Sequence, residues 1–568
     1  MKFENNLNTF GPKYKRPCFS TSLKKSVNEN QKYLLNFFEN FNYLNKNESF
    51  KFGKNTPHSI IRLTQKDFDL GTVRITKPGV YVLNENIVFN PNEENDFFPT
   101  HEQVKSNLYP IGRDGPYHLG FFAAITIETE NVILDLNGHT IKQSILHNLQ
   151  QRFYSHIELA NSPFIPKQGP GSFIASDTFV FAENVLIKNG ILAKSSHHGI
   201  HGNSMKNIIL DNIEITDFEV AGIALNGTKN GIITDINIHD SSKKVPVLST
   251  YSAARFIRNF LPSVKKNHKN PFITIQGEKI YYDDIVKNLN AVLEETKNHV
   301  LEKNNNLIDN LFLNNNNMSD GNVYGLLLHV NGVAVNGFNT IRNNNMIGNE
   351  NIFLQNISIS NISSHPIEII GINNKTKTNG NYGKNMQVGS AGEVIRINDI
   401  FSKDGMYIPN QLSNAQMLIG KYNTPKIGTT NISSEIIDVV ERNQNFNNLI
   451  KENVFYYIDG ADSMAHVMKG NMGLFVSCGI NIIGNNILIK NIRNETTNIG
   501  LSQLINENQK TQGSTCNGIL MTGSEKIYFS KCCIDNIYSN LGNKGVHEIY
   551  NINSFDISIN DNYISINK

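Results

Sequence analysis

A 23-residue repeat in residues 184–240 constrains the fold of this chain more than any other sequence feature. Asn184, Asn207 and Asn230 occupy equivalent positions in successive repeats, and Gly199 and Gly222 follow the same step. Repeats of this length are typical of solenoids, in which each unit packs only against its neighbours. We therefore expect the chain to form a stack of similar coils.

Within each repeat, apolar residues recur at every second position. They form three short runs, represented by Ile208 and Leu210, by Ile213 and Ile215, and by Ile223 and Leu225. Alternation with a period of two predicts strands. Asn189, Asn212 and Asp235 lie between two runs, where Asn and Asp tolerate left-handed backbone and can hydrogen-bond locally. We expect these residues to stack at a bend.

An earlier segment, NVILDLNGHTIKQS (residues 131–144), fits the same pattern. It predicts inward side chains at Val132, Leu134, Leu136 and Ile141, with a bend at Asn137 and Gly138. His139 lies beside that bend. We expect His139 to be an exposed or corner-packing residue rather than a catalyst.

The apolar spacing returns in residues 351–359, 486–492 and 526–537, with Asn356, Asn491 and Lys531 expected at the bend. Two stretches interrupt it. Residues 243–320 contain two helical patterns, and residues 371–470 are rich in Gly and Asn. The predicted organisation is an N-terminal extension (1–60), a cap region (61–130), repeats (131–242), a helical insertion (243–320), repeats (321–370), an irregular insertion (371–470) and C-terminal repeats (471–568).

The composition of the chain bears on which partners it could bind and on the cellular compartment in which it works. The chain has 52 basic and 50 acidic residues, so its charge gives no reason to expect a nucleic-acid partner. It lacks a run of about eighteen apolar residues, and its N-terminus has no signal-peptide core, so we expect no membrane association. Five cysteines without paired clusters favour a reducing compartment. We expect a soluble protein of the cytoplasm or of a virion. The composition is compatible with a homo-oligomer but does not predict one.

The coil segment LDLNGHTI, with Asn at the corner, resembles the right-handed parallel β-helix superfamily typified by pectate lyases. This resemblance implies an all-β, right-handed parallel β-helix (solenoid) carrying a helical insertion. The segments SSHHGIHG and YSAARFIR also resemble uncharacterised β-helix proteins of large DNA viruses and algae. The superfamily includes polysaccharide lyases, glycoside hydrolases and viral fibre proteins. The ordered motif set of the polygalacturonases is absent, so the resemblance assigns no catalytic residue.

One candidate site follows from the repeat itself. Lys194, Asp217 and Asp240 are separated by the same step, so they would be neighbours on successive coils. Asp217 and Asp240 could act as a catalytic acid and base on a glycoside, or could bind Ca²⁺, the one cofactor this pattern suggests. The alternative is a charge ladder in which Lys194 neutralises Asp217. Glu219 lies nearby as a candidate substrate-binding residue.

SSHHGIHG is the densest histidine cluster of the chain. His197 is a candidate for proton transfer and His201 for substrate binding, with Lys194 beside them. Corner packing is the alternative for both histidines, and a metal site would require a sharp bend at Gly199, so the metal assignment stays unknown. Arg255 and Arg258 on the inserted helix could bind an anionic sugar, or could be solvated at the surface.

A second acidic segment contains Asp459, Asp462 and His466, which could bind Ca²⁺ or form a polar surface loop. Two functions are therefore compatible with the sequence. One is a β-helix protein that binds or processes polysaccharide, as a lyase or glycoside hydrolase. The other is a non-enzymatic structural or attachment protein, such as a virion component that binds glycans. Carboxylates converging with Arg or His would favour the enzyme.

Overall fold

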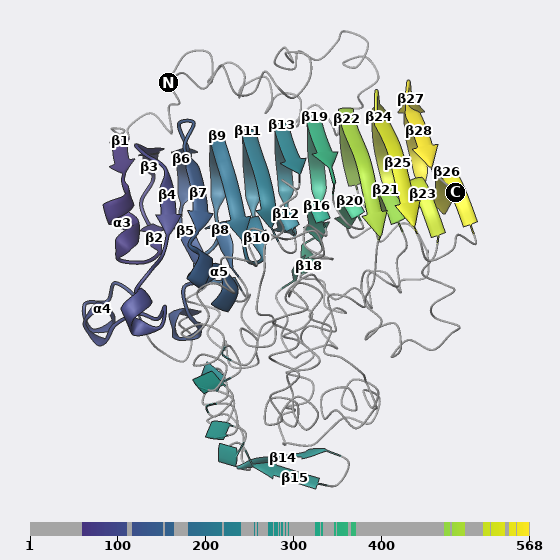
Figure 1. Cartoon of the computed structure of the whole chain (residues 1–568). Helices are drawn as coiled ribbons and strands as arrows, with labels where there is room; N and C mark the ends of the chain where they lie inside the picture. The colour runs from purple at the N-terminus through teal and green to yellow at the C-terminus, as the bar shows by residue number, and fades with distance from the viewer. Residues whose placement is uncertain are drawn as a thin grey trace.

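The computed structural model shows an all-β protein dominated by two long parallel sheets (Figure 1). It describes residues 60–110, 116–151, 154–163, 180–218, 221–239, 349–361, 365–370, 471–477, 480–494, 515–522, 524–539, 545–552 and 554–566. It also describes residues 324–329, 331–332 and 346–347, and parts of 255–294. The predicted bounds of the N-terminal extension and of the 371–470 insertion fall largely outside these residues.

Sheet A contains fourteen strands, ten of which follow one another in chain order. These ten are β1 (Ile60–Leu63), β3 (Gly79–Leu83), β6 (Glu130–Asp135), β9 (Glu183–Ser195), β11 (Lys206–Phe218), β13 (Lys229–His239), β19 (Glu350–Ser360), β22 (Ile480–Asn494), β24 (Glu525–Ser530) and β27 (Phe555–Asn560). The other four are β4 (Ile87–Phe89), β7 (Thr140–Gln143), β25 (Cys533–Ser539) and β28 (Tyr563–Ile566).

Sheet B contains ten strands, also in chain order. They are β2 (Val73–Ile75), β5 (Ala123–Ile127), β8 (Ser155–Glu158), β10 (His198–Asn203), β12 (Ala221–Asn226), β16 (Tyr324–His329), β20 (His365–Ile370), β21 (Asn471–Ser477), β23 (Thr515–Thr522) and β26 (Gly545–Ile552). From β9 to β13 the chain alternates strictly between the two sheets. The 23-residue step is therefore the pairing register: Ile208 lies opposite Val185 and Gly231.

Helices are few and short. They are α3 (Gln65–Asp69), α4 (His101–Lys105) and α5 (Ile145–Gln150), with 3-10 turns η4 (Glu93–Asn95) and η5 (Pro116–Leu119). In the predicted helical insertion, the described residues between 283 and 294 are helical, as expected. The same insertion also holds an antiparallel hairpin, β14 (Phe272–Ile275) and β15 (Glu278–Tyr281), which the helical pattern did not predict. A second small pair is β17 (Asn331–Gly332) with β18 (Met346–Ile347).

The interior between the sheets is filled by the alternating apolar residues. Val132, Leu134, Leu136 and Ile141 are completely buried, which confirms their predicted inward positions. The equivalent residues of later strands continue the same cluster, including Ile208, Leu210, Ile213 and Ile215. Full burial of one such side chain stabilises the fold by about 1.5 to 3 kcal/mol. Repetition of this burial along the stack favours a single register.

Asparagines stack along one bend of the strands, at the equivalent positions that the repeat aligned. Asn207 Nδ2 donates to Asn184 Oδ1 at 2.7 Å, and Asn230 Nδ2 donates to Asn207 Oδ1 at 2.8 Å. The ladder continues to Asn351 and Asn481 at 2.9 and 2.8 Å. All these residues have left-handed φ between 55° and 62°. Asparagine suits the position because it tolerates this backbone and supplies both a donor and an acceptor.

A second ladder marks the next bend and confirms the predicted stacking of Asn212 on Asn189. Asn212 Nδ2 donates to Asn189 Oδ1 at 3.0 Å, and Asn356 Nδ2 donates to Asp235 Oδ1 at 2.8 Å. Asn486, not Asn491, continues this ladder by donating to Asn356 Oδ1 at 2.8 Å. The predicted alignment was therefore wrong by one bend, because asparagines recur at consecutive bends of the same coil and are alike in sequence.

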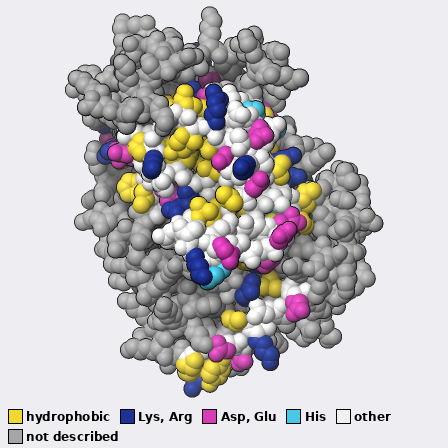
Figure 2. Space-filling model, turned by 90° about the vertical axis from the view of Figure 1, so that its left-hand side faces the viewer, with side chains coloured by type: hydrophobic (Ala, Val, Ile, Leu, Met, Phe, Trp, Pro, Cys, Tyr) yellow, Lys and Arg dark blue, Asp and Glu magenta, His cyan; other side chains and the backbone are white. Residues whose placement is uncertain are grey.

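The described surface at the β1 end of the stack mixes charges of both signs with apolar side chains (Figure 2). This mixture agrees with the nearly balanced count of acidic and basic residues. Among the described residues, none of the helices has the length and apolar character needed to cross a bilayer.

Candidate active site

The candidate site lies on the outer face of sheet B, where β8 and β10 pair in parallel. Ile157 lies opposite Ile200, and Glu158 lies opposite His201. Both isoleucines are completely buried in the interior. Because successive side chains of a strand point to opposite faces, Glu158 and His201 project from the outer face.

Glu158 and His201 form a buried carboxylate–imidazole pair. His201 Nδ1 lies 2.7 Å from Glu158 Oε2, and the two side chains are 3 % and 1 % exposed. Ser155 Oγ donates to the same carboxylate oxygen at 3.2 Å. The other oxygen, Oε1, has no hydrogen-bond partner in the structure as described. The carboxylate thus retains acceptor capacity in a shielded place, which is costly unless something uses it.

Two further histidine rings extend this pair into a row. The rings of His198 and His201 are stacked, with centroids 5.1 Å apart and planes 13° apart. The His197 ring lies 4.0 Å from that of His198. All three histidines are buried. Within the described ranges, three or more His, Cys, Asp or Glu residues nowhere form a group that could hold a metal ion.

The pair has the geometry of a histidine held for proton transfer. An ionised carboxylate only accepts hydrogen bonds, so the proton between the two groups belongs to His201 Nδ1. In that tautomer Nε2 of the same ring carries no proton, and a neighbouring carboxylate stabilises the imidazolium that forms when such a ring takes one. This is the carboxylate–histidine arrangement used in general acid–base catalysis.

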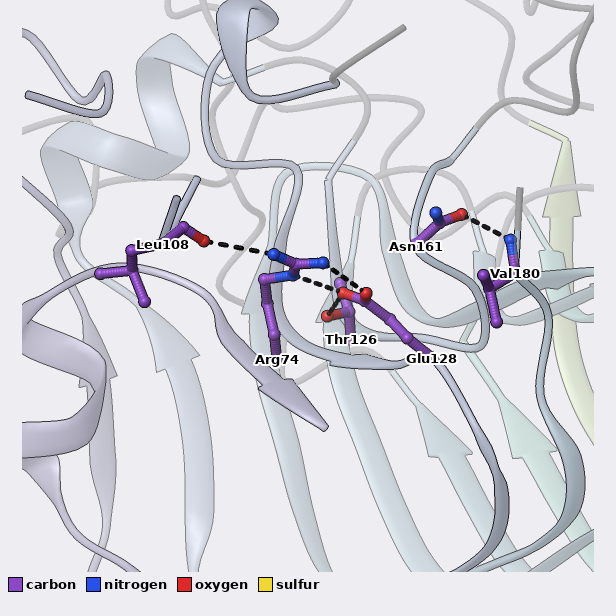
Figure 3. A network of polar contacts seen from close by, with 6 residues as sticks. All are labelled: Arg74, Leu108, Thr126, Glu128, Asn161 and Val180. Carbon is purple, nitrogen blue, oxygen red and sulfur yellow. Dashed lines mark hydrogen bonds and ion pairs between the residues drawn. The ribbon is translucent and has the colours of Figure 1, made fainter. Parts of the chain in front are cut away.

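The row of outer-face residues continues toward the start of the chain. Arg74 lies opposite Thr126, which lies opposite Glu158. Arg74 Nε and Nη2 donate to the two carboxylate oxygens of Glu128 at 2.8 and 2.7 Å, and Thr126 Oγ1 donates to Glu128 Oε1 at 2.6 Å (Figure 3). The hydrogen bond to Glu128 raises the pKa of Arg74. Both carboxylate oxygens of Glu128 thus accept hydrogen bonds from protein groups, so we interpret this ion pair as structural.

Figure 3 also places two contacts that fix the surrounding loops. Arg74 Nη1 donates to the Leu108 carbonyl at 3.3 Å, and Val180 N donates to Asn161 Oδ1 at 3.0 Å. The first ties the loop after α4 to sheet B. The second joins the segment after β8 to the segment before β9.

Two further histidines, His147 and His156, are completely buried. His156 Nε2 hydrogen-bonds the Ala193 carbonyl at 3.0 Å, and Tyr154 Oη lies 3.0 Å from His156 Nδ1. His147 packs its ring against Phe89 and Tyr154. Burial lowers the pKa of His156 to about 3 and that of His147 well below its ordinary value. Both are neutral packing residues.

The structure places Lys194 and Asp217 on adjacent coils, as the repeat predicts. Their neighbours pair in register, with Ala193 opposite Thr216 and Ser195 opposite Phe218. Both have left-handed backbone, with φ of 52° and 56°, so they form another bend of the coil. Asp240 and Glu219 lie outside the described residues. The predicted pairing of Asp217 with Asp240 therefore stays a prediction, as does the role of Glu219.

The predicted sugar-binding arginines are partly or fully buried. Arg255 is 3 % exposed, with its guanidinium 4.1 Å from the ring centroid of Phe98 and Nη2 3.6 Å from Asp96 Oδ2. Nη2 also donates to the Asp96 carbonyl. Arg255 thus anchors the insertion to residues 96–98. Arg258 is half-buried. The candidate Ca²⁺ ligands Asp459, Asp462 and His466 lie outside the described residues.

Sequence reasoning found His197 and His201 but missed Glu158. A signal was present: SHIE aligns with HGIH when Ile157 is matched to Ile200. The two strands are not one repeat apart, however, since Glu158 and His201 are separated by 43 residues. A scan of protein-family models and a search of curated proteins found no match to this chain.

Proposed function

We propose that this protein is a right-handed parallel β-helix that binds and processes polysaccharide, with His201 as general base and Glu158 as its positioning residue. The alternation of the chain between two parallel sheets and the constant register support the β-helix. Parallel crossovers are nearly always right-handed, which supports the hand. The observation that carries the catalytic part is the 2.7 Å His201–Glu158 pair on the outer sheet face.

A long parallel sheet suits a linear polymer. Its strands are spaced by about 4.8 Å, so outer-face side chains recur at a fixed interval along the stack. A chain of sugar units lying across the strands would meet such a row repeatedly. This geometry supports a polysaccharide rather than a small molecule as the substrate class.

A single histidine base favours β-elimination on a uronate over hydrolysis. Hydrolysis of a glycoside ordinarily requires two carboxyl groups, whereas among the described residues the carboxylate recorded against His201 is that of Glu158. In the elimination, Nε2 takes the proton α to the uronate carboxylate. The electron pair of that C–H bond forms the C4–C5 double bond, and the C4–O bond breaks to release the leaving sugar. Ca²⁺ bound to the substrate carboxylate would assist by acidifying this proton.

The test is a panel of neutral and acidic polysaccharides with and without Ca²⁺. Unsaturated-product absorbance and reducing ends are measured separately. We expect absorbance and reducing ends to rise together on an acidic polymer, and His201→Gln to reduce turnover at least 100-fold. The matched control is His239→Gln, which alters a chemically similar pair on sheet A, where His239 Nε2 lies 3.0 Å from Glu214 Oε1. Equal losses in both variants would contradict the proposal.

The shielding of the same pair favours a second function, that of a non-enzymatic structural or attachment protein such as a virion component. With exposed fractions of 3 % and 1 %, His201 and Glu158 could serve only to fix the strands. In that case the panel would give binding to a glycan without turnover, and His201→Gln would change stability alone. Soluble homo-oligomers in the cytoplasm or a virion would fit this second function, and the free thiols of Cys532 and Cys533 in the described part fit either.

A further inference from the structure

The apolar interior of the stack reaches the surface at the end formed by β26, β27 and β28. These strands are the last ones in the order of the two sheets, and Figure 1 places them together at the end opposite β1. Ile549 of β26 lies opposite Ile519 of β23. Ile519 is completely buried in the interior, whereas Ile549 is 46 % exposed. The interior column of sheet B is therefore open at this end.

The other two strands of this last coil show the same loss of burial. Ile557, Ile559 and Ile564 pack against the interior cluster but are only partly buried. The residues opposite them on the preceding coil are 0 to 1 % exposed, namely Ile527, Phe529 and Ile534. All three strands thus carry interior positions that the stack leaves uncovered.

The backbone of β27 also has an open edge. In the part of the chain that the structure describes, β26, β27 and β28 each pair on one side only. Lys531 N donates to the Asn560 carbonyl at 3.1 Å, so the backbone groups of Asn560 point toward the preceding coil. These groups alternate in direction along a strand, so the N–H and C=O of Ile557 and Ile559 point to the open edge. Such an edge can pair with another strand.

We propose that a second copy of this chain binds here, with β27 of the two copies antiparallel about a two-fold axis at Ser558. This register places Ile557 opposite Ile559 of the second copy, where their edge-pointing N–H and C=O groups can hydrogen-bond. Both isoleucines then continue the interior. On the outer face, Asp556 lies opposite the neutral Asn560 of the second copy. A shift by one residue would set interior residues against outer-face residues.

The same axis places β26 of one copy beside β28 of the other, which covers Ile549 and Ile564 together. The result is a closed dimer, because the axis uses one surface of each copy. The β1 end is different. There α3 lies beside β1, with Phe68 completely buried and with Lys66 and Asp69 exposed (Figure 1). Head-to-tail stacking would have to desolvate these charges, which favours the joining of two identical ends.

The test is sedimentation velocity of the full chain over a dilution series. We expect a dimer that dissociates to a monomer on dilution. Ser558→Glu sets two carboxylates directly opposite each other at the axis, so it should raise the dissociation constant about 5- to 10-fold at low salt. Ser558→Lys should act likewise, and an equimolar mixture of the two variants should restore the dimer. The matched control, Ser360→Glu, adds the same charge at a half-buried position of β19 within the stack and should change nothing.

Four outcomes would overturn the proposal. The unaltered chain could stay monomeric throughout the series, a result that needs no variant to fold. It could instead form assemblies that keep growing with concentration, which would indicate head-to-tail stacking. Ser558→Glu could leave the dissociation constant unchanged, or weaken it no more than Ser360→Glu does, while circular dichroism shows intact folds. The mixture of Ser558→Glu and Ser558→Lys could stay dissociated, which would exclude the two-fold axis at this residue.

Discussion

Nδ1 of His201 lies 2.7 Å from Oε2 of Glu158, and this contact joins β10 to β8 on the outer face of sheet B. The two residues are 43 positions apart in the chain. The contact joins a buried carboxylate to a buried imidazole, so it defines both the candidate chemistry and a stability test.

The first prediction concerns the energetic coupling of this pair. We expect His201→Ala to lower the free energy of unfolding by about 3 kcal/mol, because it leaves a buried carboxylate without its imidazole partner. Glu158→Gln should recover part of that loss in the double variant, because the carboxamide carries no charge. Denaturant unfolding of both single variants and the double variant measures the coupling.

The comparison pair is Glu214 and His239, whose side chains are 17 % and 18 % exposed. Its coupling should not exceed about 1 kcal/mol, because solvent screens partly exposed charges. A coupling at Glu158 and His201 no larger than that of this pair would refute the first prediction.

The second prediction concerns the asparagine ladder. Asn207→Ala removes one donated and one accepted hydrogen bond and places a Cβ-bearing residue without local hydrogen bonding at φ 55°. We expect a loss of about 2 to 4 kcal/mol. Asn207→Gly should cost about 1 kcal/mol less than Asn207→Ala, since glycine adopts this backbone freely. Thermal unfolding ranks the variants, and an Ala variant as stable as the Gly variant would show that backbone conformation is unimportant here.

The third prediction explains a departure from the repeat at Gly190, which lies opposite Ile213 of the next coil. A Cβ at Gly190 would lie 2.2 Å from Leu136 Cβ and 2.9 Å from the His139 carbonyl. Leu136 thus fills the interior where later coils use isoleucine. We expect Gly190→Ala to destabilise the fold by about 1 to 3 kcal/mol through overpacking.

Gly231 supplies the control for that substitution. A Cβ there would approach only Ile352 Cδ1 at 3.0 Å and Thr228 Cγ2 at 3.3 Å. Gly231→Ala should therefore cost less, since ends of side chains can move. The same midpoint shift in both variants would argue against the packing account.

The fourth prediction concerns pH. Burial lowers the pKa of His156 to about 3, below its unfolded value near 6.5. Between these values the unfolded chain binds a proton that the folded chain does not, so stability falls as pH falls from about 6.5 toward 3. The slope is at most about 1.4 kcal/mol per pH unit for this residue. His156→Gln should flatten the slope of unfolding free energy against pH, and an unchanged slope would contradict the assignment.

The repeat and the bends were predictable because they are local and periodic. Asn184, Asn207 and Asn230 recur at one spacing, and their donor and acceptor groups make the stacking a direct consequence of that spacing. Asn491 was misassigned because consecutive bends of one coil use the same residue type. The hairpin of β14 and β15 was missed because its two short runs were not separated from the helical patterns around them.

The candidate site was predictable only in part. His201 stands out in a histidine-rich segment, but Glu158 lies in a strand whose distance along the chain does not match the repeat. The burial of Arg255 was likewise not evident, because it depends on Phe98 and Asp96, which lie far away in sequence. Contacts of this kind depend on where an irregular segment returns to the stack.

The amino-acid sequence by itself determined the repeating unit of this protein, its strand alternation and the residue types at its bends. These properties depend on neighbours two to 23 residues away and on the backbone preferences of single residues. Only the tertiary structure decided that Glu158 meets His201 and that a row of apolar side chains on the outer face of sheet A, such as Ile209 and Ile232, is buried. Both depend on strand register across insertions of unequal length, which local periodicity does not specify.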